Sequence, residues 1–364
     1  MVNLRGQSWN VPGHFTSLIG REQELEAVCA LLSQPGIRLL TLHGPGGIGK
    51  TRLALALANP LQNRFPDGIA FISLAPIREP ERVLPAIAQE LGIQAHAGVP
   101  LLEQFQAVLR NKHLLLILDN LEQVIAAAPL LETFLATCPQ IKLVVTSRML
   151  LHIPGEQVFP VPPLAVPHLA PLPEKEVLIH YAAVALYVQQ ARARRPDFQL
   201  TTTNASAIAE VCVHLDGLPL ALELAAAHVS LLSPQALQAR LPQRLQLLTR
   251  STQGAPDRLQ SLQKMLDWSY ELLSEKDQQL FRRLSVFRGG CTLPAAAVVC
   301  MGADDLEREV LERTDALLSQ SMLQYVEQPD GEARLVLLEC VGIRLPRNGK
   351  ESSESERAGW KRSG

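Results

Sequence analysis

The chain has 364 residues, 47% of them apolar and 19% charged, a balance typical of globular proteins with a sizeable core. Its formal net charge of -2 excludes a global positive field that would draw it to nucleic acid or to an anionic membrane. The first residues lack the apolar core of a secretion signal, and the longest apolar stretch, interrupted by Glu223 and His228, is too short to span a bilayer. We therefore expect a cytoplasmic protein with no membrane contact.

The first half of the chain alternates short apolar runs with helical patterns. The apolar runs cover 37–44, 68–74, 113–119, 141–148 and 156–164, and helical patterns lie at 52–59, 80–91, 101–110 and 129–137. Apolar runs of this length separated by helices predict a parallel sheet covered on both faces. We expect an α/β domain at 15–165, preceded by a flexible N-terminus at 1–14.

The second half of the chain changes character after a Pro-rich linker at 161–173. An all-α domain is expected at 166–250, with helices at 175–195, 204–215 and 218–231. A third domain is expected at 251–340, with helices at 258–273, 275–285 and 304–318 and a hairpin around the turn PDGE. Three helices followed by a hairpin are typical of a winged helix. The polar remainder, 341–364, is expected to be disordered.

The clearest motif is GPGGIGKT at 44–51, which fits the complete pattern of a phosphate-binding P-loop between a strand and a helix. Its glycines let backbone N–H groups point into one concavity, and the helix N-terminus adds partial positive charge. Lys50 is expected to bridge the β- and γ-phosphates, and the Thr51 hydroxyl to ligate Mg²⁺. The predicted phosphate-binding residues are Gly44, Pro45, Gly46, Gly47, Ile48, Gly49, Lys50, Thr51 and Arg52.

Two later strands supply candidate catalytic residues. Asp119 ends an apolar run and is expected to hold Mg²⁺ together with Thr51. Arg148 follows the strand in VVTSR, where it could reach the γ-phosphate, although a solvated arginine is the simpler alternative. Asn120 can orient water but cannot accept its proton. Glu122 could be the base, although a solvated or helix-capping carboxylate is the commoner outcome at such a position.

Five stretches in this order resemble one family. They are FTSLIGREQELEAV (15–28), GPGGIGKT, LLLILDNLEQ (114–123), VVTSR (144–148) and GLPLALELAAA (217–227). The chain resembles the STAND class of P-loop ATPases, the NB-ARC group among the AAA+ relatives. It is most similar to modules of bacterial transcriptional regulators of the LuxR and AfsR types.

The resemblance implies roles at both ends of the nucleotide. Gly20 and Arg21 would lie beside the nucleotide, Leu18 and Ile19 would flank the adenine, and Pro219 of the GLPL turn would pack on the base. The bland alternatives are a capped helix for GREQELE and an ordinary turn between helices for GLPL.

The resemblance also identifies the third domain as a winged helix. Residues 251–340 contain 9 Lys and Arg against 15 Asp and Glu, a balance that disfavours duplex binding and favours a regulatory lid. Many relatives place a Met-His-Asp triplet there, but the counterpart here is Leu337-Leu338-Glu339, without a histidine. The tail also lacks the long helix and sensor repeats of relatives, which suggests a truncated or frame-shifted end.

These features together predict a switch operated by ATP, ADP and Mg²⁺, with weak ATP hydrolysis. ADP would hold the domains closed, and ATP would favour an open form that self-associates or activates an effector protein. The alternatives are an efficient motor-type ATPase, a P-loop kinase, or a non-functional remnant. No DNA-binding domain is convincing in the sequence.

Overall fold

The chain divides into two compact units, which are described separately. The computed structural model describes residues 18–94, 96, 98–240, 270, 273–287, 290–301, 306–319, 322–327 and 333–337. Unit 1 contains the chain up to Ala165 together with His180–Leu186 and Leu218–Leu220, and unit 2 contains the remainder. The expected flexible N-terminus, most of the helix at 258–273, Leu338-Glu339 of the triplet, and the tail lie outside the described residues.

Unit 1 is built around a parallel sheet with the strand order β2-β3-β4-β1-β5. The strands are β1 (Leu39–His43), β2 (Ile69–Ser73), β3 (Leu115–Asp119), β4 (Lys142–Ser147) and β5 (Glu156–Pro160). Every residue of β3 is buried, which explains why its sequence is continuously apolar. Each predicted apolar run contains one of these strands, so the predicted parallel α/β sheet is confirmed.

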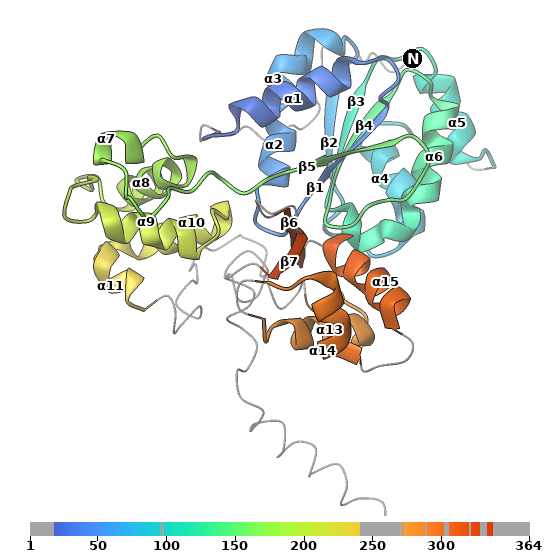
Figure 1. Ribbon diagram of the computed structural model, residues 1–364. Helices are drawn as coiled ribbons and strands as arrows, with labels where there is room; N and C mark the ends of the chain where they lie inside the picture. Colours follow the sequence, from blue (N-terminus) through green and yellow to red (C-terminus); the bar gives the residue numbers. More distant parts are fainter. Residues whose placement is uncertain are drawn as a thin grey trace, which may run out of the picture. The chain divides into compact units, whose positions relative to one another are not determined.

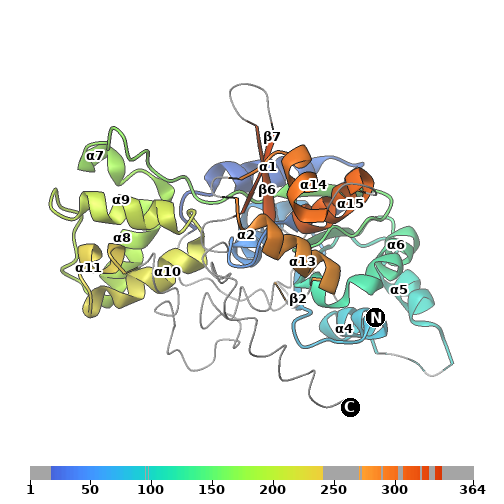
Figure 2. The same ribbon diagram turned by 60° about the horizontal axis from the view of Figure 1, so that its bottom comes forward.

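Helices cover both faces of the sheet (Figures 1 and 2). α1, α2 and α3 lie on one side of the sheet, and α4, α5 and α6 lie on the other. Phe105 of α5 meets Phe134 of α6 edge to face, with ring centroids 5.0 Å apart, within an apolar core. The helices are α1 (Glu22–Ser33), α2 (Lys50–Ala56), α3 (Ala58–Leu61), α4 (Val83–Glu90), α5 (Leu101–Leu109) and α6 (Ala128–Thr137).

Two cations close the C-terminal ends of helices in unit 1. Arg38, just before β1, donates to the carbonyls of Leu135, Cys138 and Ile141 at 2.6, 2.6 and 3.3 Å, at and beyond the end of α6. Lys142, at the start of β4, donates to the carbonyls of Leu32 and Gln34 at 2.8 and 2.6 Å, at the end of α1. These donors satisfy carbonyls that a helix leaves unpaired at its C-terminus.

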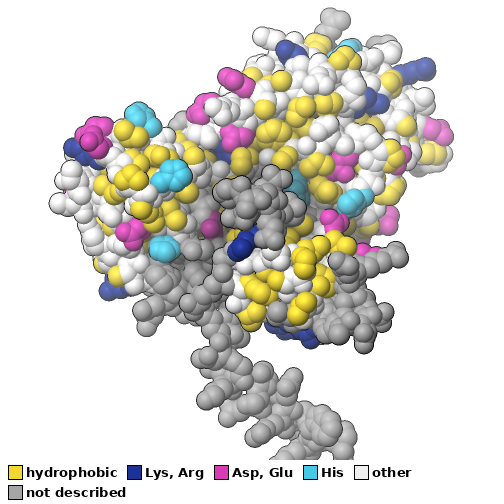
Figure 3. Space-filling model, viewed as in Figure 1, with side chains coloured by type: hydrophobic (Ala, Val, Ile, Leu, Met, Phe, Trp, Pro, Cys, Tyr) yellow, Lys and Arg dark blue, Asp and Glu magenta, His cyan; other side chains and the backbone are white. Residues whose placement is uncertain are grey.

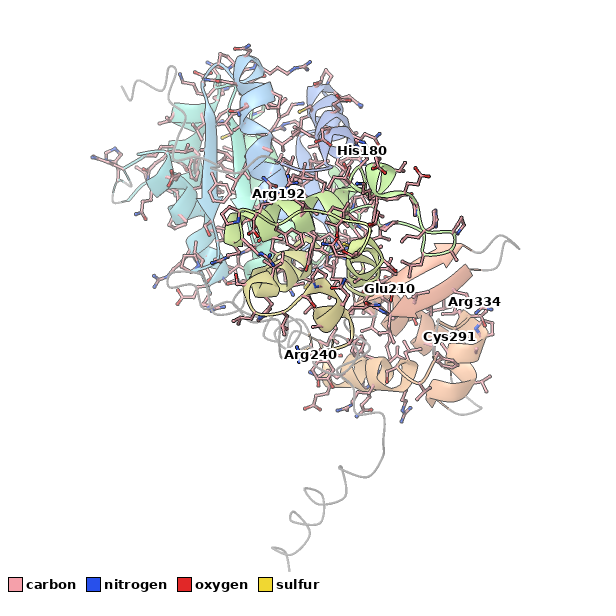
Figure 4. All side chains as sticks on the ribbon, turned by 90° about the vertical axis from the view of Figure 1, so that its left-hand side faces the viewer. His180, Arg192, Glu210, Arg240, Cys291 and Arg334 are labelled. Atoms are coloured by element: carbon pink, nitrogen blue, oxygen red, sulfur yellow. The ribbon has the colours of Figure 1, made fainter. Side chains whose placement is uncertain are left out.

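Beyond the sheet the chain is mainly helical. The remaining helices are α7 (Lys175–Leu178), α8 (Ala182–Arg194), α9 (Ala205–His214), α10 (Pro219–Ala227), α11 (Pro234–Gln238), α13 (Glu275–Leu284), α14 (Leu293–Met301) and α15 (Leu306–Ser319). Within unit 2, Glu210 of α9 accepts a hydrogen bond from Gln238 of α11, and Arg192 of α8 donates to the Phe198 carbonyl at 3.1 Å (Figure 4).

A hairpin ends the described part of unit 2. β6 (Leu323–Glu327) and β7 (Ala333–Leu337) pair in antiparallel register, as expected from the turn signal between them. Cys291 bridges to Leu335 of β7 through two backbone hydrogen bonds of 3.0 and 2.8 Å, and its place beside the hairpin is visible in Figure 4.

Some helix predictions differ from the structure. The expected helix at 175–195 is divided into α7 and α8, and the one at 218–231 gives way after Ala227 to a short 3-10 turn. α14 was not predicted, because its segment LPAAAVVCM is almost uniformly apolar and shows no amphipathic period. None of the helices in the described part of the chain is long and apolar enough to cross a membrane.

Candidate functional site

The carboxyl ends of three adjacent strands bring most of the predicted site residues together. β4 lies between β1 and β3, so the ends of these strands are neighbours. The P-loop segment follows β1, Asp119 ends β3, and Arg148 follows β4. Ligands of open parallel sheets bind beyond this edge, because the loops there can surround them.

The segment 44–49 forms a loop that leads directly into α2. Gly49 precedes the helix with a φ of 100°, a left-handed conformation that glycine adopts without steric cost. Lys50 is buried, and its Nζ donates to the carbonyls of Gly44 and Pro45 at 2.6 and 3.0 Å. Burial lowers the pKa of Lys50 to about 8, against the opposing effect of Glu122. The ammonium group is therefore held at the loop and is mainly charged at neutral pH.

Two hydroxyls converge on the carboxylate of Asp119. Thr51 Oγ1 and Thr146 Oγ1 each donate to Asp119 Oδ1 at 2.6 Å. Thr51 donates a hydrogen bond to the carboxylate, and its hydroxyl oxygen keeps lone pairs that can bind a cation. Mg²⁺ prefers hard oxygen ligands of this kind, so the pair fits the predicted magnesium site. No role was predicted for Thr146 from the sequence, because a threonine at a strand end is an ordinary feature.

Glu122 and Arg148 form a buried ion pair. This corrects the expectation of a solvated or helix-capping carboxylate at Glu122, and Arg148 is not the solvated arginine of the alternative interpretation. Glu122 Oε1 lies 3.4 Å from Arg148 Nε, and both side chains are less than a tenth exposed. Glu122 Oε2 has no hydrogen-bond partner among the described residues. A Cβ added to Gly46 would lie 2.5 Å from Arg148 Nη2, so the guanidinium group rests on the P-loop backbone.

Asn120 occupies a special backbone position between Asp119 and Glu122. Its φ of 65° and ψ of 47° lie in the left-handed region, where asparagine is tolerated better than glutamate. Its N–H donates to Thr146 Oγ1 at 3.0 Å. The backbone conformation therefore supplies a reason for asparagine here that the sequence pattern did not reveal.

Arg21 contacts the P-loop from outside. The side chain is buried, and its Nη2 donates to the Ile48 carbonyl at 3.2 Å while its Nη1 pairs with Glu24 at 2.9 Å. Gly20, with a φ of 60°, packs so closely on Ala182 that an added Cβ would lie 2.2 Å from the alanine Cβ. Arg21 thus contacts the loop directly, and the position of this segment beside a nucleotide stays a prediction. Ile19, which precedes it, is partly exposed.

The GLPL turn also lies against the P-loop within unit 1. The N–H of Leu220 donates to the Gly47 carbonyl at 3.1 Å. Pro219 approaches Gly49, where an added Cβ would lie 3.9 Å from the proline ring. Leu220 and Arg21, which lie outside the loop, therefore donate hydrogen bonds to the carbonyls of Gly47 and Ile48. Arg52, in the first turn of α2, is partly exposed.

His43 ends β1 immediately before the P-loop. Burial lowers its pKa to about 4, with a further lowering by Lys50 and a smaller opposing effect of Glu156. The imidazole is therefore neutral at physiological pH, and the chain entering the loop carries no additional positive charge.

Comparison with known proteins agrees with this geometry. Residues 36–150 match the family described as AAA domain. The uncharacterized protein Rv0894 of Mycobacterium tuberculosis is 33% identical over 345 residues, which cover 94% of this chain and 84% of that protein. The chain belongs to the same family as Rv0894. The matched segment 36–150 of this chain includes the P-loop, Asp119 and Arg148.

Two further relatives carry the names of regulators. The M. tuberculosis protein Rv0890c, named as an HTH-type transcriptional regulator, is 36% identical over 313 residues, covering 86% of this chain and 33% of that protein. The regulatory protein AfsR of Streptomyces coelicolor is 26% identical over 326 residues, covering 86% of this chain and 30% of AfsR. The chain thus spans about a third of the length of these regulators.

Proposed function

We propose that the chain is a nucleotide-operated switch that binds ATP or ADP with Mg²⁺ and hydrolyses ATP slowly. The observation that carries this proposal is the buried pair of Glu122 and Arg148 against the P-loop. The carboxylate best placed to act as a base is held by an arginine, and such a site is suited to retaining nucleotide rather than turning it over.

The P-loop residues are arranged to bind phosphate. When phosphates occupy the loop, Lys50 exchanges the carbonyls of Gly44 and Pro45 for phosphate oxygens. Thr51 and Asp119 would hold Mg²⁺, which supplies positive charge to offset that of the phosphates. Leu220 and Arg21 bind the carbonyls of Gly47 and Ile48. In a trans peptide the carbonyl and the N–H point in opposite directions. The N–H groups of the next residues, Ile48 and Gly49, therefore point away from Leu220 and Arg21.

The segments that engage the loop from outside are those that would lie beside the adenine. Arg21 and Leu220 hold consecutive P-loop carbonyls, and Pro219 packs next to Gly49. Adenine bound against Ile19 and Pro219 therefore stabilises the same segments that order the phosphate loop. A ligand shifts a conformational equilibrium only through different affinities for the two states, and this shared set of contacts provides such a difference.

The partners of the switch follow from its relatives and its charge. The regulator names of the longer relatives support a role as a signal-transduction module, with self-association or an effector protein as the output. On the face of unit 1 seen in Figure 3, acidic and basic side chains are interspersed. Direct DNA binding is therefore not part of this proposal.

The proposal is tested by the nucleotide content and turnover of the purified full chain. We expect mass spectrometry to find ADP retained through purification, and steady-state ATP turnover below about 1 s⁻¹, a rate ordinary for enzymes. Lys50→Ala should abolish nucleotide binding. Lys112→Ala is the matched control, because Lys112 pairs with Asp67 at 2.8 Å outside the candidate site.

Two results would contradict the proposal. Turnover well above about 1 s⁻¹ would favour a motor-type ATPase or a kinase, in which Glu122 is released as an efficient base. Unchanged nucleotide binding in Lys50→Ala would refute the site itself.

A further inference from the structure

The hydroxyl of Thr146 joins the end of β4 to the end of β3. It donates to Asp119 Oδ1 at 2.6 Å and accepts the N–H of Asn120 at 3.0 Å. Thr146 is fully buried, and its hydrogen bond to Asp119 is shielded from water. We propose that Thr146 is a positioning residue that fixes the Asp119 carboxylate for Mg²⁺. This inference rests on the proposed nucleotide-binding function.

Thr146 lies immediately beyond the last backbone pairing between β3 and β4. The parallel pairing of the two strands ends at Leu118 and Val145. The next residues along the strands are Asp119 and Thr146, and there the threonine side chain takes over from the backbone ladder. Because Asn120 turns into the left-handed region directly afterwards, a hydrogen bond to its N–H also fixes the direction in which β3 leaves the sheet.

The position of Asp119 is defined from two sides. Thr51 approaches Oδ1 from α2, and Thr146 approaches the same oxygen from β4. Thr51 is itself expected to bind Mg²⁺, so its hydrogen bond must adapt when the cation arrives. Thr146 has no such second task. It therefore keeps the carboxylate in place while Thr51 adjusts.

Substitutions that remove or keep the Thr146 hydroxyl distinguish a positioning role from a purely structural one. Thr146→Val removes both hydrogen bonds at nearly constant volume, whereas Thr146→Ser retains the hydroxyl. Thr41→Val is the matched control on β1, because Thr41 is fully buried and its Oγ1 has no hydrogen-bond partner among the described residues. The measurement is the Kd of the full chain for ATP, by calorimetry, with Mg²⁺ and with EDTA.

We expect Thr146→Val to weaken Mg²⁺-dependent ATP binding by about tenfold or more, the effect of a hydrogen bond to a charged group. Binding in EDTA should change little, because the P-loop and Lys50 do not depend on Thr146. Thr146→Ser and Thr41→Val should behave like the wild type. A purely structural threonine would instead lower the melting temperature while leaving the ratio of the two Kd values unchanged.

The comparison of Thr146→Ser with Thr146→Ala repeats the test if the valine variant does not fold. Both lack the methyl group and differ only in the hydroxyl, so an equal Mg²⁺ dependence in the two would overturn the inference. If the wild type binds no ATP, the proposed function fails and the inference falls with it. If the wild type shows Mg²⁺-dependent binding that all Thr146 variants keep, only the positioning role is refuted.

Discussion

At the scale of single residues, the ion pair of Glu122 and Arg148 is the most consequential contact. Two charges that leave water pay a desolvation penalty, which their attraction offsets only while both are present. Breaking such a pair strands one charge in the interior. The folded protein therefore strongly prefers the intact ion pair until another anion binds Arg148.

This preference is measurable by a double-mutant cycle. Arg148→Met should lower the free energy of unfolding by about 3 kcal/mol, because the buried Glu122 carboxylate loses its ion-pair partner. Adding Glu122→Gln should recover a large part of that loss. Urea unfolding of the two single variants and the double variant gives the coupling energy. Strictly additive effects would show that the two side chains do not interact.

At the scale of elements, helix ends in unit 1 depend on cations from elsewhere in the chain. Arg38 satisfies three carbonyls around the end of α6, and its guanidinium group fans across them with Nε and Nη2. Burial lowers the pKa of Arg38, and the group still remains a cation at any physiological pH. One side chain thus joins α6 to the segment that begins β1.

Removal of this cap should destabilise the domain. Arg38→Met should cost about 2 kcal/mol in the free energy of unfolding, because several carbonyls lose their donors together. The control is Arg82→Met, since Arg82 pairs with Glu79 and the side chains are 70% and 62% exposed. That variant should lie within about 0.5 kcal/mol of the wild type by urea unfolding. Equal losses in the two variants would argue against the capping role.

The order of the strands and helices explains which features could be predicted from the sequence and which could not. The P-loop and Asp119 were predictable because each depends on consecutive residues at the end of an apolar strand. Thr146 and the contact of Glu122 with Arg148 were not, because both require β4 to lie beside β3 in the sheet. The helix α14 was missed because a uniformly apolar segment carries no period.

At the scale of the whole molecule, His43 links stability to pH. Its folded pKa of about 4 lies below its ordinary value of 6.5, mainly through burial and then through Lys50. Between these values the unfolded chain binds more protons than the folded chain, so stability must fall as the pH decreases.

We expect this residue to remove up to about 3 kcal/mol of stability between pH 6.5 and pH 4. Urea unfolding at several pH values measures the total loss, to which carboxylates also contribute. His43→Gln should reduce the loss over this range, because glutamine does not titrate. Identical pH profiles for the wild type and the variant would show that His43 is not a source of the acid sensitivity.

The strand order has a consequence for how the protein is made. β4 lies between β1 and β3, yet it leaves the ribosome after both of them. A nascent chain that has exposed GPGGIGKT and LLLILD has β1 and β3 but still lacks β4, the strand that lies between them. The segment KLVVTSR forms β4 and brings Thr146 and Arg148 with it. We therefore expect the growing polypeptide to complete the proposed nucleotide site only after β4 has been synthesised.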